Sequence, residues 1–115
     1  MNLSYEPDGD LLEVIFNESL HDAEQKAYRL RDGLMLFVAA DSMEPVQLTI
    51  VSYRGLAQLP SFYFSGWAKL KATDRKKLLP IINSPQVSTF VKLDAKTGYG
   101  HLASHAILEP FALAA

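Results

Sequence analysis

The chain has 115 residues, of which 49% are hydrophobic and 21% are charged, and it contains no cysteine. This composition is typical of one globular domain with a single core, and it excludes disordered chains, disulfide-linked folds and sites built on thiolates. Residues 1–50 carry ten acidic and three basic residues, a net charge of −7, whereas residues 51–115 carry eight basic and three acidic residues, a net charge of +5. We expect these opposite charges to complement one another once the two halves fold together.

The sequence predicts neither a membrane span nor a secretory signal. No stretch approaches the ~18 consecutive apolar residues of a spanning helix, and the first residues lack the basic region and apolar run of a signal peptide. We therefore expect a cytoplasmic protein that has no membrane partner.

The chain opens with a predicted β-hairpin. Two short apolar stretches, Asn2 to Tyr5 and Leu11 to Phe16, flank the segment Pro7-Asp8-Gly9-Asp10. An Asp-Gly pair in this position favours a tight turn, because such a turn needs a residue with positive φ.

Three more strands are predicted before residue 54. Lys26 to Leu30 and Leu34 to Val38 flank a second turn at Arg31-Asp32-Gly33. Val46 to Tyr53 then alternates with a period of two, which places Val46, Leu48 and Ile50 on one face. We interpret the five strands as an antiparallel β-meander.

After Arg54 the two-residue alternation ends, and short helices and turns are predicted instead. Thr73 is a suitable N-cap for a helix whose apolar side is formed by Leu78, Leu79 and Ile82, and Pro80 should kink or end that helix. Ser84-Pro85 predicts the start of another helical turn that runs to about Phe90.

The last part of the chain admits two interpretations. Val91 to Asp94 and Tyr99 to Ser104 can pair as a hairpin, whereas the alanine-rich stretch from His101 to Leu108 can be helical. We favour the hairpin. The predicted fold is thus α+β in a single domain, with a β-meander over residues 1–53 and a mainly helical extension with a possible C-terminal hairpin over residues 54–115.

The N-terminal half carries a family resemblance in Tyr5, in the acidic turn before Asp10-Leu11-Leu12, and in Arg31-Asp32-Gly33-Leu34-Met35-Leu36. With the apolar strand through Ile50, these residues resemble the bacterial domain-of-unknown-function family twenty-two eighty-three, over about residues 3–53. Some members of that family look like partners of small toxin-like proteins, so the resemblance implies an antitoxin-like role. The sequence departs from the family at Ser42-Met43-Glu44, where a glycine-containing turn is common, and in adding residues 54–115.

An aromatic run is the first candidate functional feature, and its rings are Phe62, Tyr63, Phe64 and Trp67. Such rings cover an apolar face or a free edge of a sheet, either within the chain as core or across a homodimer. We favour core for these rings, with a dimer contact second.

A basic segment follows the aromatic run and comprises Lys69, Lys71, Arg75, Lys76 and Lys77. Basic residues beside aromatic rings can bind single-stranded nucleic acid through phosphate contacts and stacking. A solvated helix face explains the same charges, and the acidic first half argues against strong binding of nucleic acid.

His101 and His105 form the third candidate site, because a spacing of four places both side chains on one face of a helix or a strand. A zinc or iron site would need a third ligand from His21, Asp22 or Glu24. The residue after His101 is Leu102, so the glutamate of the helical zinc-protease motif is absent. We expect no bound metal and no cofactor.

The candidate carboxylates for acid–base catalysis are Asp8, Asp10 and Glu13. The first two lie in a predicted tight turn, where local hydrogen bonds to the backbone explain aspartate. No Gly-x-Ser-x-Gly nucleophile motif is present in the sequence. We therefore expect a protein that is not an enzyme.

These observations favour a non-enzymatic protein-interaction module that binds a protein partner, or itself as a homodimer, through an open sheet edge and the aromatic run. The alternatives are a nucleic-acid-binding module that uses the basic segment and a metal-dependent enzyme that uses His101 and His105. The final Ala-Leu-Ala-Ala resembles the end of the tag that bacteria add during rescue of stalled ribosomes, which would make it a degradation signal.

Overall fold

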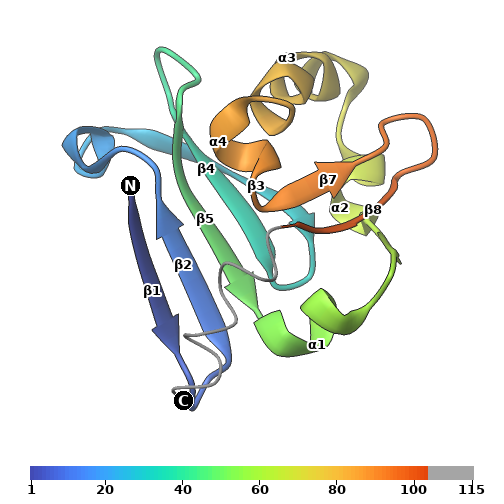
Figure 1. The fold of residues 1–115 in the computed structure, drawn as a ribbon. Coiled ribbons are helices and arrows are strands. Elements are labelled where there is room, and N and C mark those ends of the chain that lie inside the picture. The colour runs from blue at the N-terminus through green and yellow to red at the C-terminus, as the bar shows by residue number, and fades with distance from the viewer. Residues whose placement is uncertain (104–115) are drawn as a thin grey trace.

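The computed structural model describes residues 1–103 and contains the expected five-stranded antiparallel sheet (Figure 1). Its strands are β1 (Asn2–Glu6), β2 (Leu11–Ile15), β3 (Gln25–Arg31), β4 (Leu34–Ala39) and β5 (Pro45–Val51). The predicted α+β class and the predicted strands are confirmed.

The order of strands across the sheet is β1-β2-β5-β4-β3. Strands β3, β4 and β5 form a meander, and the β1–β2 hairpin docks on β5 rather than on β3. The pairing of β2 with β5 runs from Leu11 opposite Val51 to Ile15 opposite Gln47. The last of these five strands in the sequence, β5, is therefore the central strand of the sheet.

The first hairpin turn differs in detail from the prediction, because its positive φ falls on Asp10 (49°) and not on the Asp8-Gly9 pair. Aspartate tolerates the left-handed conformation better than most residues do, and the side chain of Asp10 is held there by hydrogen bonds that are described below. The second turn has its positive φ of 79° at Gly33, as predicted.

Four short helices and a second, three-stranded sheet follow β5, in agreement with the change of pattern after Arg54. These elements are α1 (Tyr53–Gln58), β6 (Phe62–Tyr63), α2 (Ser65–Lys69), α3 (Ala72–Ile82), α4 (Pro85–Ser88), β7 (Val91–Leu93) and β8 (Tyr99–Leu102). The small sheet has the order β6-β8-β7, which confirms the C-terminal hairpin. No helix among these residues is long and apolar enough to cross a membrane.

The helix boundaries correct two details of the prediction, the N-cap of α3 and the end of α4. Thr73 lies inside α3, whose N-cap is Lys71, and no side chain caps this end. Pro80 is also inside α3, which ends within a turn of it at Ile82. Helix α4 begins at Pro85 as expected but ends at Ser88, short of Phe90.

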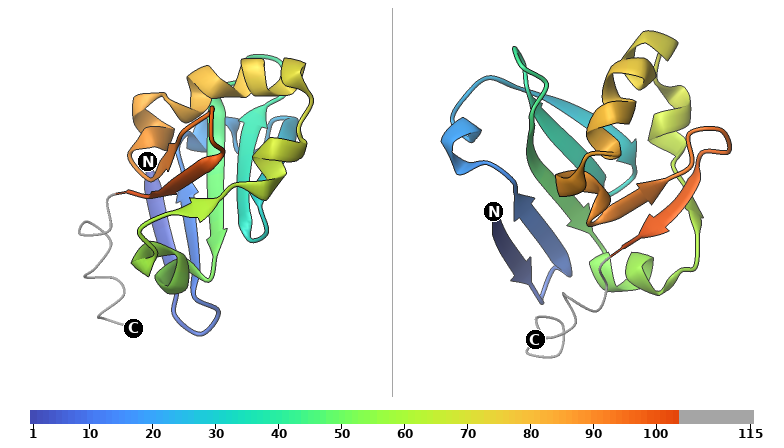
Figure 2. Two further views of the ribbon diagram at one scale, coloured as in Figure 1. Left: turned by 90° about the vertical axis from the view of Figure 1, so that its right-hand side faces the viewer. Right: turned by 45° about the horizontal axis from the view of Figure 1, so that its top comes forward.

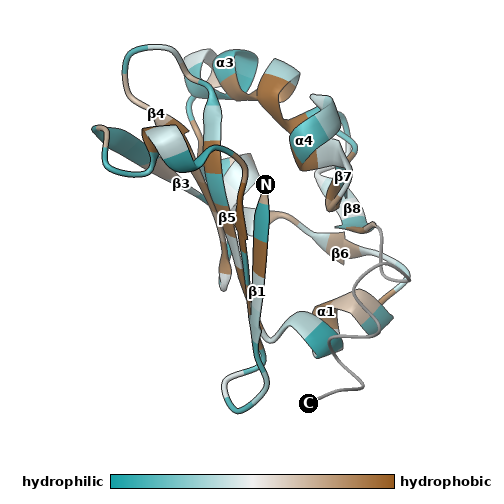
Figure 3. Ribbon diagram, turned by 60° about the vertical axis from the view of Figure 1, so that its left-hand side comes forward, coloured by the Kyte–Doolittle hydropathy of each residue, from teal (hydrophilic) through white to brown (hydrophobic). Residues whose placement is uncertain are grey.

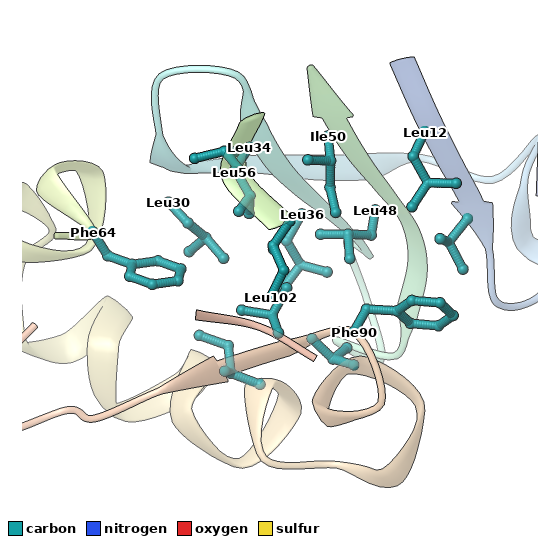
Figure 4. Close-up of a cluster of buried hydrophobic side chains, with 14 of the residues drawn as sticks. Leu12, Leu30, Leu34, Leu36, Leu48, Ile50, Leu56, Phe64, Phe90 and Leu102 are labelled. Carbon is teal, nitrogen blue, oxygen red and sulfur yellow. The ribbon is translucent and has the colours of Figure 1, made fainter. Parts of the chain in front are cut away.

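Helices α1 to α4 and the small sheet lie on one side of the five-stranded sheet, as Figures 2 and 3 show, whereas the short 3-10 helix η1 (Glu18–Leu20) lies in the loop between β2 and β3. Between these layers is the core, in which Leu36 and Leu48 of the sheet are fully buried and Phe90 and Leu102 approach from the covering elements (Figure 4). Alternation along the strands decides which side chains enter the core, because successive residues point to opposite faces.

Helix α2 contacts the backbone of edge strand β3 at a glycine. A Cβ atom at Gly66 would lie 1.9 Å from the carbonyl oxygen of Arg29, a distance that no side chain can occupy. Because only glycine permits this approach, α2 covers part of the β3 edge, whereas no described element pairs with the outer edge of β1.

We predict that Gly66→Ala destabilises the fold by more than about 2 kcal/mol, because the new methyl group must push α2 away from β3. Gly55→Ala is the matched control, since a Cβ at this helical glycine of α1 meets nothing within 4 Å. Gly55→Ala should leave the stability unchanged or raise it by up to about 1 kcal/mol through helix propensity. Urea denaturation followed by circular dichroism measures both, and equal midpoints would contradict the close contact.

Candidate functional site

The most prominent surface feature of the described residues is the side of the five-stranded sheet that faces away from the helices (Figure 3). We call this side the outer face. Its apolar members are Leu11, Ile15, Met35, Phe37 and Val51, and its polar members are Glu13, Arg29, Gln47 and Thr49. Among residues 1–103, the turn around His21 contacts this face at one end, through Gln25 and Gln47, and α2 borders it beside Arg29 and Met35.

The apolar side chains of the outer face do not belong to the core. They are half-buried by their neighbours in the sheet, and Val51 is 45% exposed. Other partly buried apolar residues, such as Leu3 and Tyr5 of β1, pack against the core cluster from its rim. The residues of the outer face point in the opposite direction and have no such layer to pack against.

The register of the strands arranges the outer face in rows. Glu13 lies opposite Thr49, and Thr49 lies opposite Met35 on its other side. Met35 in turn lies opposite Arg29, so the row carries a carboxylate on β2 and a guanidinium on β3, with Ser4 of β1 beyond Glu13. In the sheet a hydrogen bond of 3.1 Å from Gln47 Nε2 to Thr49 Oγ1 follows β5 along the middle of the face.

A second constellation joins the first hairpin to helix α1. The hydroxyl group of Tyr5 donates to Asp10 Oδ1 at 2.7 Å, and the backbone N–H of Arg54 donates to both carboxylate oxygens of Asp10 at 3.1 Å. The ring of Tyr5 meets that of Tyr53 edge-on, with centroids 6.1 Å apart. Asp10 therefore fixes the turn and caps α1, which is a structural role rather than that of a free catalytic acid.

The two tyrosines of this constellation have raised pKa values. Partial burial raises the pKa of Tyr5 above its ordinary value, the neighbouring Asp10 carboxylate raises it further, and Arg54 opposes this effect. Burial likewise raises the pKa of Tyr53, whose hydroxyl has no hydrogen-bond partner among residues 1–103. Both phenols are thus held neutral in the folded protein over the physiological pH range.

The predicted aromatic contact surface requires a correction, because three of its four rings are core. Phe64 is fully buried, Phe62 and Trp67 are 6% and 2% exposed, and Phe62 stacks on Phe64 with centroids 4.9 Å apart. Only Tyr63 is largely exposed, and it lies against Tyr99. The core interpretation of these rings is therefore confirmed, and the run cannot serve as a contact surface without opening the fold.

The basic segment is solvent-accessible. Lys69 ends α2, Lys71 precedes α3, and Arg75, Lys76 and Lys77 lie on α3. None of these five residues makes an ion pair with a described carboxylate. The ion pair that is seen, Arg29 with Asp32 at 3.9 Å, lies within the N-terminal half, so the expected neutralisation of one half by the other is not found at these residues.

The histidines are not brought together with the other proposed ligands. His101 is exposed on β8 in the layer over the core, directly opposite Lys92 of β7. His21 instead lies 3.2 Å from the side-chain oxygen of Gln47, on the outer face. No group of three metal-ligating side chains occurs among residues 1–103, and His105 and the C-terminal Ala-Leu-Ala-Ala lie outside the described residues.

An open hollow of about 420 Å³ lies beside His101, and its other lining residues include Asn83, Ser88, Lys92 and Asp94. It mixes charges of both signs on an exposed surface. Nothing in it brings a nucleophile and a base into contact, so it is not a candidate active site on the geometry of the described residues.

The outer face was missed at the level of sequence, although a signal for it exists. Val14-Ile15-Phe16 and Leu34-Met35-Leu36-Phe37-Val38 are continuous apolar runs, and such runs indicate strands that are apolar on both faces. In β5 the alternation predicts only the buried face, which carries Val46, Leu48 and Ile50.

No family model, curated protein or solved structure matches this chain. The resemblance of residues 3–53 to a bacterial family therefore stays a prediction.

We predict opposite effects for removing the two hydroxyl groups around Asp10. Tyr5→Phe deletes the hydrogen bond to Asp10 and should destabilise the protein by about 1–2 kcal/mol, whereas Tyr53→Phe removes an unpartnered buried hydroxyl and should be neutral or stabilising. Tyr99→Phe, at a ring that is 51% exposed, is the control. Urea denaturation at pH 7 measures all three, and a larger loss for Tyr53→Phe than for Tyr5→Phe would contradict the assignment.

We also predict a loss of stability at alkaline pH. The pKa of Tyr53 is higher in the folded than in the unfolded chain, where it is about 10.0, so the resulting stabilisation is complete below pH 10 and is lost as the pH rises through the folded value. The free energy of unfolding should therefore fall more steeply above pH 10 in the wild type than in Tyr53→Phe. Parallel pH profiles of the two proteins would contradict this.

Proposed function

We propose that this chain is a non-enzymatic protein-interaction module that binds a protein partner, or a second copy of itself, through the outer face. The observation that carries the proposal is the group of apolar side chains on β2, β4 and β5 that face away from the helices and that no sheet or helix layer of residues 1–103 covers. Removing apolar surface from water is the main driving force of protein association, and contiguous uncovered apolar surfaces commonly mark binding sites.

The composition of the outer face also supports binding. Its apolar side chains alternate with the polar Thr49 and Gln47 and are flanked by Glu13 and Arg29. Non-obligate protein–protein interfaces have this mixture of apolar contacts with a polar rim. Charged residues are rarely found on a face that is buried in the interior of a larger fold.

The β1 edge extends this surface. Strand β1 pairs with β2 on one side only, whereas α2 approaches the opposite edge of the sheet at Gly66. Unpaired N–H and C=O groups of an edge strand can receive a strand of another chain. Among residues 1–103 no strand pairs with this edge, and it adjoins the outer face rather than the aromatic run.

We predict that Val51→Glu disrupts partner binding and that Leu59→Glu does not. The two side chains are equally exposed, at 45% each, but Val51 is on the outer face and Leu59 follows α1 on the other side of the sheet. Both variants should fold, because a charge at an exposed position costs little. We expect Val51→Glu, but not Leu59→Glu, to lose the proteins that copurify with the wild type from the native host. Val51→Glu should also lose any self-association that the wild type shows in sedimentation experiments.

Equal recovery of partners and equal sedimentation for the wild type and both variants would contradict the outer face as the binding surface. Circular dichroism and thermal denaturation of each variant provide the folding control. A variant that has lost the native spectrum is replaced by Phe37→Ser, which tests the same face with an uncharged side chain.

Nucleic-acid binding is the second candidate, and the unpaired charges of the basic segment favour it. The stacking component of that hypothesis is reduced to Tyr63, because Phe64 and Trp67 are buried. Phosphate contacts alone give weak binding that falls steeply with salt.

We therefore predict that the protein does not bind single-stranded DNA or RNA with a dissociation constant below ~1 μM at ~150 mM salt. Fluorescence anisotropy with labelled oligonucleotides measures this. Tighter binding that is lost on Lys76→Glu plus Lys77→Glu would establish the second candidate over the first.

A further inference from the structure

The outer face carries opposite charges in one row, on β2 and on β3, and this arrangement is self-complementary. Glu13 of β2 and Arg29 of β3 are separated by the two strands β5 and β4, through Thr49 and Met35. Three strand spacings amount to about 14 Å, too far for the two side chains to form an ion pair within one chain.

A twofold axis in the plane between two sheets can run across the strands or along them, and we compare the two cases in which it places this row over its own copy. An axis across the strands places each strand over its own copy. Glu13 then faces Glu13 of the partner subunit, and Arg29 faces Arg29 of the partner subunit. Both contacts bring like charges together and are repulsive.

An axis along the strands, between β4 and β5, has the opposite result. It places β2 over β3 of the second copy and β5 over β4 of the second copy. Glu13 then faces Arg29 of the partner subunit, and by symmetry Arg29 faces Glu13 of the partner subunit. Thr49 lies over Met35 in the middle of the same row.

The distances of ordinary sheet packing permit these ion pairs. Facing sheets lie about 10 Å apart, which an arginine and a glutamate side chain span together. The usual crossing angle of about 30° displaces the two residues by roughly 4 Å along the strands, about one residue, which the long arginine side chain can absorb. The apolar side chains of β2, β4 and β5 are covered in the same arrangement.

Arg29 is available for such an exchange. Its contact with Asp32 is long, at 3.9 Å, and the two side chains are 67% and 96% exposed. An ion pair of this kind contributes little to stability, so its loss on dimerisation costs little.

We infer that the outer face binds a second copy of this chain, in a twofold dimer in which Glu13 and Arg29 pair reciprocally across the interface. This inference rests on the proposed function and names the partner of that surface. The interface joins the two copies face to face and leaves the β1 edges open.

Charge reversal tests the arrangement, because each single variant creates two repulsive contacts in its own dimer. Glu13→Arg and Arg29→Glu should each weaken the dimer by at least ~10-fold in dissociation constant. An equimolar mixture of the two should restore dimers, since the heterodimer has two attractive pairs. The double variant Glu13→Arg plus Arg29→Glu should also dimerise alone.

The controls are Lys26→Glu and Glu24→Arg. Lys26 lies on the same strand as Arg29 but opposite Val38, on the other face of the sheet, and Glu24 lies in the loop before β3. Neither should change dimerisation. Sedimentation equilibrium of the purified chains between ~1 and ~300 μM, supported by circular dichroism as the folding test, gives all of the dissociation constants.

The outcomes separate this inference from the proposed function. A wild type that stays monomeric throughout this range overturns the dimer, while the effect of Val51→Glu on copurified proteins still decides the proposed function. A dimer that Val51→Glu abolishes but that neither charge reversal weakens shows that the face binds a copy in a different arrangement, which overturns the reciprocal pairing. Weakening by both single variants, with recovery in the mixture, establishes it.

Discussion

The burial of one face of the five-stranded sheet is the constraint on which the rest of the structure depends. Strands β4 and β5 contribute fully buried side chains such as Leu36 and Leu48, and the covering layer comes entirely from the chain after Val51. Two glycines permit close contacts, one between α2 and β3 and one between β8 and its neighbours. A Cβ at Gly66 would collide with the backbone of β3, and one at Gly100 would lie 1.9 Å from the carbonyl oxygen of Lys92 and 2.9 Å from the ring of Phe64.

The strands could be predicted from sequence because each is bounded by turn residues and has its own apolar pattern. Gly33, for example, has the positive φ that its turn requires. The helix boundaries were less accurate, because packing outweighed capping preference. Helix α3 begins at Ala72 without a side-chain cap, and its position follows from burial of Leu78 and Ile82 rather than from Thr73.

The candidate site was less predictable, because it is created by long-range pairing. Each strand shows which of its residues share a face, but nothing local says that β2 lies beside β5 or that Glu13 and Arg29 share a row. The aromatic run illustrates the opposite difficulty. Its composition suits an interface as well as a core, and only the burial of Phe64 and Trp67 decides for the core.

The central position of β5 has a consequence for the order in which the protein folds as it is synthesised. The first hairpin and the β3–β4 hairpin can each form early from local contacts, but neither can join the other until β5 has left the ribosome. Contacts such as Leu11 with Val51 close a long loop and are therefore formed late. Until then both hairpins expose pairing edges and apolar side chains, so β5 acts as the strand that converts two transient fragments into one cooperative unit.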